Sequence, residues 1–469
     1  MTAEPATTGS SWRDLVVDGR LPRFALVCAG TWLAAADELV TATVMPSAAR
    51  DIGGYTAFGW AVAIFLLGSI LGGATAGRLT ARFGLRTAMA IAGATYALGC
   101  AASALAPDIG VFLAGRLAQG LGGGWVVGLS YVASTSLFPE ALWSRVLSGL
   151  AGVWGVATLV SPLIGGVFAE IHFWRGAFWT FAAQGLAFIV ATAFLVPRGA
   201  ARGEASGRPP VLQVAVLALS VAAIGAAGLL PTPLAKGTAG LAGIALLALF
   251  LRIDTHAPTS LLPRQTGRPA SAVAAGLFMI FTLNAATVSF SVYGTSLMQR
   301  LYGATPILAG YILGGGALGW TLSALVIAGR GWARGYIRLG VALIAATQVA
   351  MMFVVPHGSI AAIAALVFVS GAGFGMAWAF VAARIVANTD DAERPLASGS
   401  VPTASMIGAA VAAAAAGSIA TALGVGRGMS LGSARAAGFW LFAAFLPLLA
   451  AAVLAAWRLT NRRFDPPSA

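Results

Sequence analysis

Two adjacent acids, Asp37 and Glu38, lie in the middle of an apolar stretch and are the residues best suited to chemistry. The stretch covers residues 24–46, long enough to cross the ~30 Å hydrocarbon core of a bilayer. A charge at the centre of a membrane helix costs roughly 2.5–3.5 kcal/mol, so such acids usually face a bundle interior or an aqueous cavity. No other Asp or Glu lies inside a predicted span, and the only buried base that we find is Arg116, in another span.

Successive residues of a helix point about 100° apart, so the two acids cannot face the same direction. We expect one acid to face a central cavity and the other to face a seam between helices. Burial favours the neutral form of a carboxyl group, whereas a nearby cation favours the charged form. An acid balanced between these effects can exchange a proton for a cationic or polar substrate. Alternatively, Asp37, Glu38 and Arg116 form a purely structural buried network.

The composition is that of a polytopic membrane protein rather than a soluble domain. Of the 469 residues, 59% are hydrophobic and 9% are charged, whereas about 25% of residues are charged in soluble domains. The net charge of +13 does not indicate a nucleic-acid partner, because the basic residues lie in short loops between apolar runs. Cys28 and Cys100 lie in apolar spans, so we expect buried thiols and no disulfide.

Fourteen apolar runs can cross a membrane as helices, and an all-α fold follows. We place these spans at 24–46, 57–77, 87–106, 110–133, 146–168, 176–196, 211–229, 234–252, 271–295, 307–328, 337–355, 360–382, 401–422 and 436–457. Most arginines fall on one side of the membrane if both termini are cytoplasmic. We therefore predict a multi-pass protein of the inner (cytoplasmic) membrane with that orientation.

An internal repeat divides the chain into two similar halves. Residues 77–86 (GRLTARFGLR) are echoed by residues 329–338 (GRGWARGYIR), although any short cytoplasmic loop tends to be rich in arginine. Two related halves indicate a transporter with its binding site at their interface. We expect a cytoplasmic tail at 1–23, a six-helix bundle at 24–196, a linker with an additional hairpin at 197–270, a six-helix bundle at 271–457 and a tail at 458–469. The helices of the hairpin, 211–229 and 234–252, are interpreted as transmembrane, with interfacial helices (twelve spans) as the alternative.

Five motifs resemble those of one transporter family. DELVTATVMPSAARDIGG (37–54) resembles the first-helix signature of the drug:proton antiporter branch of the major facilitator superfamily, in its fourteen-span form. GRLAQGLGGG (115–124) is similar to its fourth-helix motif, and GVWGVATLVSPLIGG (152–166) is similar to its fifth-helix antiporter motif. WRGAFW (174–179) and LMQRLYGATPILAG (297–310) also match. The chain is thus identified as a member of this branch.

The resemblance implies a fold and a set of roles. The fold is two six-helix bundles with an extra helix pair between them. Asp37 occupies the signature place, so it is favoured over Glu38 as the titrating group, with Arg116 as counter-ion. The remaining motif positions are Gln119 and Gly120 of the fourth helix, Gly155, Ser161, Pro162, Gly165 and Gly166 of the fifth, and Gly77, Arg78, Arg82, Gly84 and Arg86 of the gating loop.

The fifth-helix glycines, with Gly152, are expected to allow close approach of a neighbouring helix, and the proline to favour a kink. Two departures from the family pattern matter here. Ala81 replaces an Asp in the loop motif, which alters any cytoplasmic latch formed by that acid, and Ser161 replaces a Gly. The loop arginines can still dock on a helix C-terminus, which attracts cations.

Polar and aromatic residues deep in the spans are candidates for the substrate cavity, with simple packing as the alternative for each. They are Trp125, Trp154, Asn284, Tyr293, Phe374, Met376 and Trp378. Aromatic and Met-lined surfaces with few polar groups suit amphipathic organic molecules.

These observations predict a proton-coupled exporter of small lipophilic or cationic organic compounds that acts by alternating access. We expect no cofactor, no metal and no enzymatic activity; a proton gradient supplies the energy, and no GxxxxGK[ST] motif is present. The expected partners are the substrate, protons and lipid, and the protein is expected to be a monomer. A dedicated transporter of one metabolite, or a membrane enzyme or sensor, is the alternative.

Overall fold

The protein is a bundle of long helices in the computed structural model. The structure describes residues 15, 19–54, 57–200, 209–328, 330, 332–426 and 429–461, and all regular elements in these ranges are helical. Most of the two predicted tails, and Arg202 and Arg208 of the linker, lie outside the described residues. The α-helices are α1 (Arg20–Ile52), α2 (Phe58–Phe83), α3 (Leu85–Leu105), α4 (Ile109–Ser136), α5 (Glu140–Glu170), α6 (Trp174–Leu195), α7 (Val211–Ala226), α8 (Pro233–His256), α9 (Ala272–Tyr302), α10 (Pro306–Ile327), α11 (Ala333–His357), α12 (Ile360–Ala387), α13 (Arg394–Ala422), α14 (Leu431–Ala443) and α15 (Leu446–Leu459). Short 3₁₀ turns are η4 (Ala227–Leu229), η5 (Arg264–Gly267) and η6 (Asp391–Glu393).

Each predicted span corresponds to a helix or a helix pair. Thirteen of these segments are long and apolar enough to cross a membrane by their composition, and the 28-residue α4, with Gly-rich and polar positions, completes fourteen. The span predicted at 436–457 corresponds to one apolar segment, Leu431–Leu459, which forms two helices, α14 and α15, with a break at Ala444 and Phe445. Pro447 explains the break, since it has no N–H to donate to the carbonyl of Ala443.

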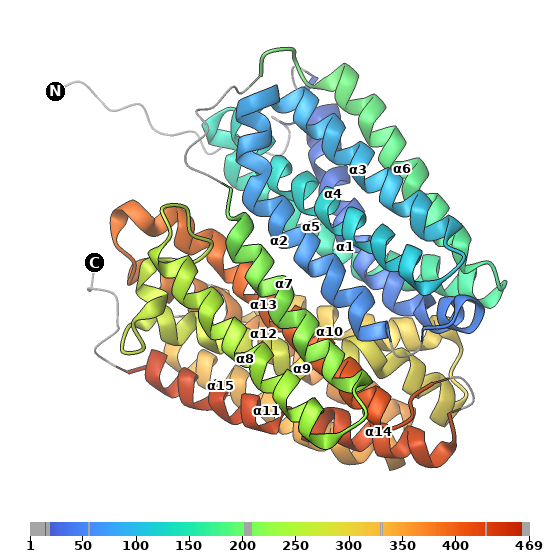
Figure 1. Cartoon of the computed structure of the whole chain (residues 1–469). Helices are drawn as coiled ribbons and strands as arrows, with labels where there is room; N and C mark the ends of the chain where they lie inside the picture. The colour runs from blue at the N-terminus through green and yellow to red at the C-terminus, as the bar shows by residue number, and fades with distance from the viewer. Residues whose placement is uncertain are drawn as a thin grey trace.

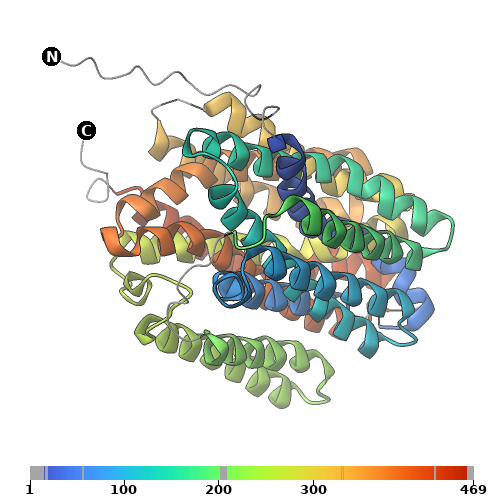
Figure 2. The ribbon, with the colours of Figure 1, turned by 90° about the horizontal axis from the view of Figure 1, so that it is seen from above.

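The helices separate into two bundles and a hairpin, as predicted. Helices α1 to α6 pack on one another, and α9 to α15 do the same. The bundles meet along two seams, α2 against α13 and α5 against α10 (Figure 1). Viewed from above, α7 and α8 lie side by side along one edge of the molecule (Figure 2).

The hairpin packs across one of the two seams. Helix α7 contacts both α2 and α13, whereas α8 packs mainly on α7. The hydroxyl of Ser418 in α13 donates to the carbonyls of Ile224 (2.7 Å) and Gly225 (2.9 Å), at the end of α7. A side chain at Gly225 would collide with Trp60 of α2. The hairpin is therefore attached to both bundles.

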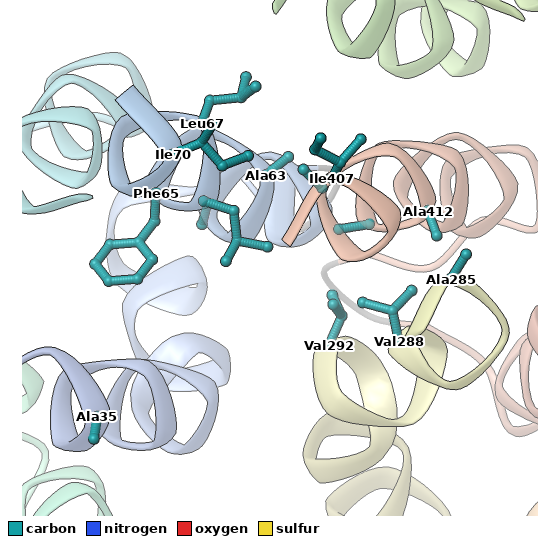
Figure 3. Close-up of a cluster of buried hydrophobic side chains, with 14 of the residues drawn as sticks. Ala35, Ala63, Phe65, Leu67, Ile70, Ala285, Val288, Val292, Ile407 and Ala412 are labelled. Carbon is teal, nitrogen blue, oxygen red and sulfur yellow. The ribbon is translucent and has the colours of Figure 1, made fainter. Parts of the chain in front are cut away.

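The two bundles touch at one end of the helices, which we call the closed end; α1 ends and α2 begins there. The Thr295 hydroxyl of α9 donates to the Ala42 carbonyl of α1 (3.0 Å), and the rings of Phe58 and Tyr293 stack with centroids 5.8 Å apart. Further along the α2–α13 seam, apolar side chains such as Ala63, Leu67 and Ile407 are buried together (Figure 3).

The opposite end, where α1 begins and α2 ends, we call the open end. A methyl group added at Gly73 or Gly77 of α2, or at Gly152 or Gly155 of α5, would have no heavy atom within 4 Å among the described residues. The two bundles therefore diverge from the closed end towards the open end.

Candidate functional site

Asp37 and Arg116 form a buried ion pair between α1 and α4. The Arg116 Nη1 atom lies 2.9 Å from Asp37 Oδ2, and the side chains are 1% and 0% exposed, respectively. The Thr41 hydroxyl, one turn further along α1, donates to Asp37 Oδ1 (3.2 Å). The guanidinium also lies over the ring of Phe65 of α2, 4.2 Å from its centroid. Both charges are thus neutralised and enclosed within the first bundle.

Gln119 extends this ion pair towards α3. Its Oε1 atom accepts from Arg116 Nη1 (2.8 Å) and from the Ser103 hydroxyl (3.4 Å). Its Nε2 atom donates to the sulfur of Cys100 (3.1 Å). Helices α3 and α4 can approach this closely because of glycines; a side chain at Gly115 of α4 would collide with Ser103 of α3. Gln119 and Asp37 therefore both accept from the same guanidinium nitrogen, Nη1 of Arg116.

Glu38 has a different environment from its neighbour. It is exposed, and it forms no hydrogen bond or ion pair with any described residue. Ala42 is one turn further along the same face of α1, and its carbonyl accepts from Thr295 of the second bundle. Ala29, about 180° away around the helix, is also exposed and marks the opposite face. Glu38 consequently faces the space between the bundles, just below the closed-end contact.

The two acids thus face different directions, as expected for neighbours on a helix: Asp37 lies buried between α1 and α4, and Glu38 is exposed. The prediction that Arg116 is the only buried base is wrong. Arg384 lies inside α12 rather than in a loop and is 5% exposed. Asp254, at the end of α8, is a further buried acid whose carboxylate accepts from the N–H groups of Leu261 and Leu262. Both lie just beyond the predicted apolar runs, so hydropathy did not reveal them.

The fifth-helix motif packs closely only at the closed end. Side chains added at Gly165 and Gly166 would collide with Thr43 of α1 and Ile307 of α10, respectively. Pro162 is buried beside Gly310, and the neighbouring Ser161 hydroxyl is buried without a hydrogen-bond partner among the described residues. The predicted close approach is wrong at Gly152 and Gly155. They lie where α5 has separated from α10.

The gating-loop arginines occupy the open end. Gly84 joins α2 to α3 with φ 76°, a left-handed value that favours glycine. Arg86 donates to the carbonyl of Ala193 in the last turn of α6, which confirms the predicted docking on a helix C-terminus. Gly77 has open surroundings, Arg78 is half-buried, and the exposed Arg82 lies over the ring of Phe83.

The second half of the chain repeats this docking. Arg338, the repeat partner of Arg86, donates to the Thr460 hydroxyl at the end of α15 (2.8 Å). Arg384 donates to the neighbouring Leu459 carbonyl (2.6 Å), and Arg23 donates to the Leu195 carbonyl at the end of α6 (3.3 Å). The repeat seen in the sequence therefore corresponds to equivalent contacts in the two bundles.

The predicted cavity residues do not form one group. Phe374 and Trp378 of α12 pack with Trp320 of α10, with centroid distances of 5.4 and 5.2 Å to Trp320. Trp154 is 44% exposed on α5, in the half that has separated from α10. Sequence reasoning missed Trp320, which lies in none of the family motifs.

The prediction that Tyr293 lines a cavity is wrong, because Tyr293 is fully buried in the closed-end contact. Trp125 is half-buried and donates to the Thr75 hydroxyl of α2 (2.8 Å). The Asn284 amide is half-buried and donates to the Ile280 carbonyl one turn earlier in its own helix; Met376 is half-buried.

Several known proteins resemble this chain in sequence, over shares that range from about a third of the chain to nearly all of it. A model of the Major Facilitator Superfamily matches residues 27–332. A probable multidrug-efflux transporter of Mycobacterium tuberculosis is 30% identical, covering 98% of this chain and 99% of the relative. Azole resistance protein 1 of Saccharomyces cerevisiae is 29% identical over 35% of this chain and 27% of its own length.

Solved structures share the fold. A D-xylose-proton symporter superposes with a TM-score of 0.63 at 17% identity, covering 95% of this chain and 98% of its own. A peptide transporter, POT, in complex with sulfate superposes with a TM-score of 0.67 at 14% identity, covering 95% and 96%.

Proposed function

Because the chain belongs to the major facilitator superfamily, a family of membrane transporters, we propose that it is a proton-coupled antiporter of the drug:proton branch. In this proposal it exports small lipophilic or cationic organic compounds by alternating access, from the inner membrane of the cell. The similarity to a probable multidrug-efflux transporter of M. tuberculosis supports the substrate class.

The observation that carries the proposal is the position of Glu38. It is an acid at mid-helix that faces the space between the bundles and has no fixed partner among the described residues. Asp37 beside it is enclosed by Arg116, so its charge is already compensated. A carboxylate that is held in no ion pair, in a low-dielectric site, attracts either a proton or a cationic substrate, and the two compete. We therefore assign the exchange to Glu38, with Asp37 and Arg116 as its fixed surroundings.

The open end corresponds to the cytoplasm in this proposal. Arg23, Arg86 and Arg338 lie at that end, as the positive-inside rule predicts for cytoplasmic loops. The molecule is then inward-facing, with Glu38 reachable from the cytoplasm. A substrate cation binds to the ionised Glu38, the bundles rock to open the closed end, and a proton from outside displaces the substrate. Each proton that returns inward supplies ~2.3 kcal/mol per 100 mV of membrane potential.

Aromatic side chains provide the surface for the apolar part of the substrate. Trp154 is exposed on α5, and Trp320 packs with Phe374 and Trp378 in the second bundle. Aromatic faces bind organic cations by cation–π attraction and apolar rings by stacking. We propose that these groups select amphipathic compounds, whereas Glu38 selects for positive charge.

The test is transport by the purified protein in proteoliposomes with an imposed pH gradient. Ethidium, tetraphenylphosphonium and a set of uncharged natural products are offered to wild type, Glu38→Gln and Asp37→Asn. We expect gradient-driven transport of the two cations by the wild type and its loss in Glu38→Gln. Transport by Glu38→Gln at the wild-type rate contradicts the assignment of the coupling residue, and transport of only one natural product favours a dedicated metabolite transporter.

A further inference from the structure

The α7–α8 hairpin and the loop that follows it are held together as one unit. The Ser220 hydroxyl of α7 donates to the Gly243 carbonyl of α8 (2.7 Å). At the open end, the Asp254 carboxylate of α8 accepts from the N–H groups of Leu261 (2.8 Å) and Leu262 (2.9 Å). The chain beyond α8 is thereby folded back, and η5 packs on α8. Helices α7 and α8 and the turn η5 therefore form one body.

This unit is attached to α13 of the second bundle at both of its ends. At the closed end, the Ser418 hydroxyl donates to the carbonyls of Ile224 (2.7 Å) and Gly225 (2.9 Å). The last carbonyls of a helix lack partners within that helix, and in a membrane such groups need a partner from the protein. At the open end, the Arg264 N–H of η5 donates to Glu393 Oε2 (3.1 Å), directly before α13 begins. The side chains of these two residues also form an ion pair at 3.8 Å.

The contact of α7 with the first bundle is of a different kind. Trp60, in the first turn of α2, is half-buried, and its indole ring lies against Gly225 of α7. A methyl group added at Gly225 would collide with this ring. Small residues allow such close approach between membrane helices. Helix α7 is thus joined to α2 by the packing of a ring on a glycine, whereas hydrogen bonds join it to α13.

Alternating access requires one of these two attachments to separate. Helices α2 and α13 meet at the closed end, where a side chain added at Gly59 would collide with the Ala413 carbonyl. The two helices must move apart there when the bundles rock to open this end. Because α7 contacts both helices, it cannot keep both contacts. Hydrogen bonds hold the hairpin unit to α13 at two distant places, so the packing of Trp60 on Gly225 is the attachment that separates.

We propose that the hairpin moves as part of the second bundle, and that Trp60 seated on Gly225 is a latch that holds the closed end shut. The latch belongs to the inward-facing state alone, so its strength sets the balance between the inward-facing and outward-facing populations. This inference rests on the proposed function for the rocking of the two bundles. The distances that test it are measured without any substrate.

The first experiment asks whether the latch holds the closed end. Spin labels at Ile171 and Leu431, exposed positions near the closed end of the first and second bundles, are introduced into a protein without its native cysteines. Electron–electron double resonance in detergent then measures their separation. We expect Trp60→Ala to raise the population of a longer distance several-fold over wild type. Trp179→Ala, which removes an exposed tryptophan from the first two turns of α6, is the matched control.

The outcomes of this comparison are distinct. A longer distance in Trp60→Ala alone supports the latch. An unchanged distance in Trp60→Ala, or an equal change in Trp60→Ala and Trp179→Ala, overturns it.

The second experiment asks with which bundle the hairpin moves. A label at Leu234, an exposed position where α8 begins at the closed end, is paired in turn with Leu431 and with Ile171. In Trp60→Ala we expect the Leu234–Leu431 distance to stay as in wild type and the Leu234–Ile171 distance to lengthen. If the Leu234–Ile171 distance is the one that stays, the hairpin moves with the first bundle and the inference is wrong.

Variants at Gly225 test the same contact from its other side. Gly225→Ala places a methyl group against the Trp60 ring and should also open the closed end, which decides the question if Trp60→Ala does not fold. In the double variant Trp60→Ala, Gly225→Leu, the new side chain occupies the space that the ring leaves, so the short Ile171–Leu431 distance should return in part. No return of this distance contradicts the latch. If wild type transports neither ethidium nor tetraphenylphosphonium, the proposed function fails, whereas these distances still decide the latch.

Discussion

Asp37 and Glu38 are consecutive residues in opposite environments: Asp37 is bound to Arg116 at 2.9 Å, whereas Glu38 is exposed towards the second bundle. The helix itself produces this difference, because a rotation of 100° per residue turns neighbouring side chains to different faces. Substitutions at the two positions should therefore have different consequences. Replacing Asp37 should lower the stability of the folded bundle, and replacing Glu38 should impair the exchange of protons for substrate.

The proposed exchange of a proton for a substrate cation at Glu38 predicts that the affinity for the cation depends on pH. In wild type, a lower pH protonates Glu38 and removes the charge that holds a cation, so the Kd of ethidium should rise as the pH falls. For one competing proton the limit is about tenfold per pH unit, since one proton is bound as one cation leaves. Glu38→Gln should bind ethidium weakly at every pH. Fluorescence titration of the protein in detergent at a series of pH values measures this, and a steep pH dependence that persists in Glu38→Gln would contradict it.

The ion pair predicts a non-additive effect on stability. Asp37→Asn leaves the Arg116 charge buried without its partner, and breaking a buried pair in this way costs about 3–5 kcal/mol. Arg116→Gln should cost a similar amount for the same reason. The double variant removes both charges, so its loss should be smaller than the sum of the two. Thermal unfolding in detergent of the four proteins completes the cycle, and additive losses would mean that the two side chains are independent.

The closed end predicts a conformational effect of a single glycine. The side chain of Gly59→Val would collide with the Ala413 carbonyl, so α2 and α13 could not remain in contact there. We expect the population to shift towards molecules that are open at this end. Spin labels at the exposed positions Ile171 and Leu431, close to the closed end of either bundle, should report a longer distance by electron–electron double resonance. Gly73→Val, which meets nothing, is the control, and an unchanged distance in Gly59→Val would refute the prediction.

Hydropathy, helical geometry and family motifs together predicted most of this fold from the sequence. Helical geometry also placed the two acids on different faces, because that depends on one helix alone. The predictions that were wrong concern residues whose contacts depend on how the two bundles meet. Gly152 and Gly155 belong to the same motif as Gly166, but whether they touch α10 is decided by the tilt of one bundle against the other.

The predictions for Tyr293 and Arg384 are wrong for a related reason. The sequence indicates that Tyr293 is a polar residue deep in a span and suited to a cavity, yet its side chain is buried where the bundles close. The hydropathy pattern places Arg384 in a loop, yet it lies within α12, where its side chain donates to the Leu459 carbonyl at the end of α15. Such contacts join residues far apart in the chain, and a single sequence carries no signal for them. Cys100 and Ser103, the partners of Gln119, were missed on the same grounds.

The equivalent arginines of the two halves predict matched losses of stability. Arg86 and Arg338 each place a positive charge at the C-terminal end of the last helix of a bundle, α6 or α15. A cation in that position interacts favourably with the helix dipole, by typically 0.3–1 kcal/mol and up to ~2 kcal/mol where it is partly buried. We therefore expect Arg86→Gln and Arg338→Gln each to lower the unfolding free energy by about 1 kcal/mol. Arg82→Gln is the control, because that side chain is exposed and lies over the neighbouring Phe83 ring rather than at the end of a helix in the other part of its bundle.

Chemical unfolding in detergent micelles, followed by tryptophan fluorescence, compares the three variants with wild type. Because the two contacts lie in different bundles, the losses in Arg86→Gln and Arg338→Gln should add in the double variant. If only one of the two variants has a lower free energy of unfolding, the repeat is present in the sequence but the two contacts do not contribute equally to stability. A loss in Arg82→Gln equal to the other two would mean that positive charge at the open end, rather than contact with a helix terminus, is what stabilises the protein.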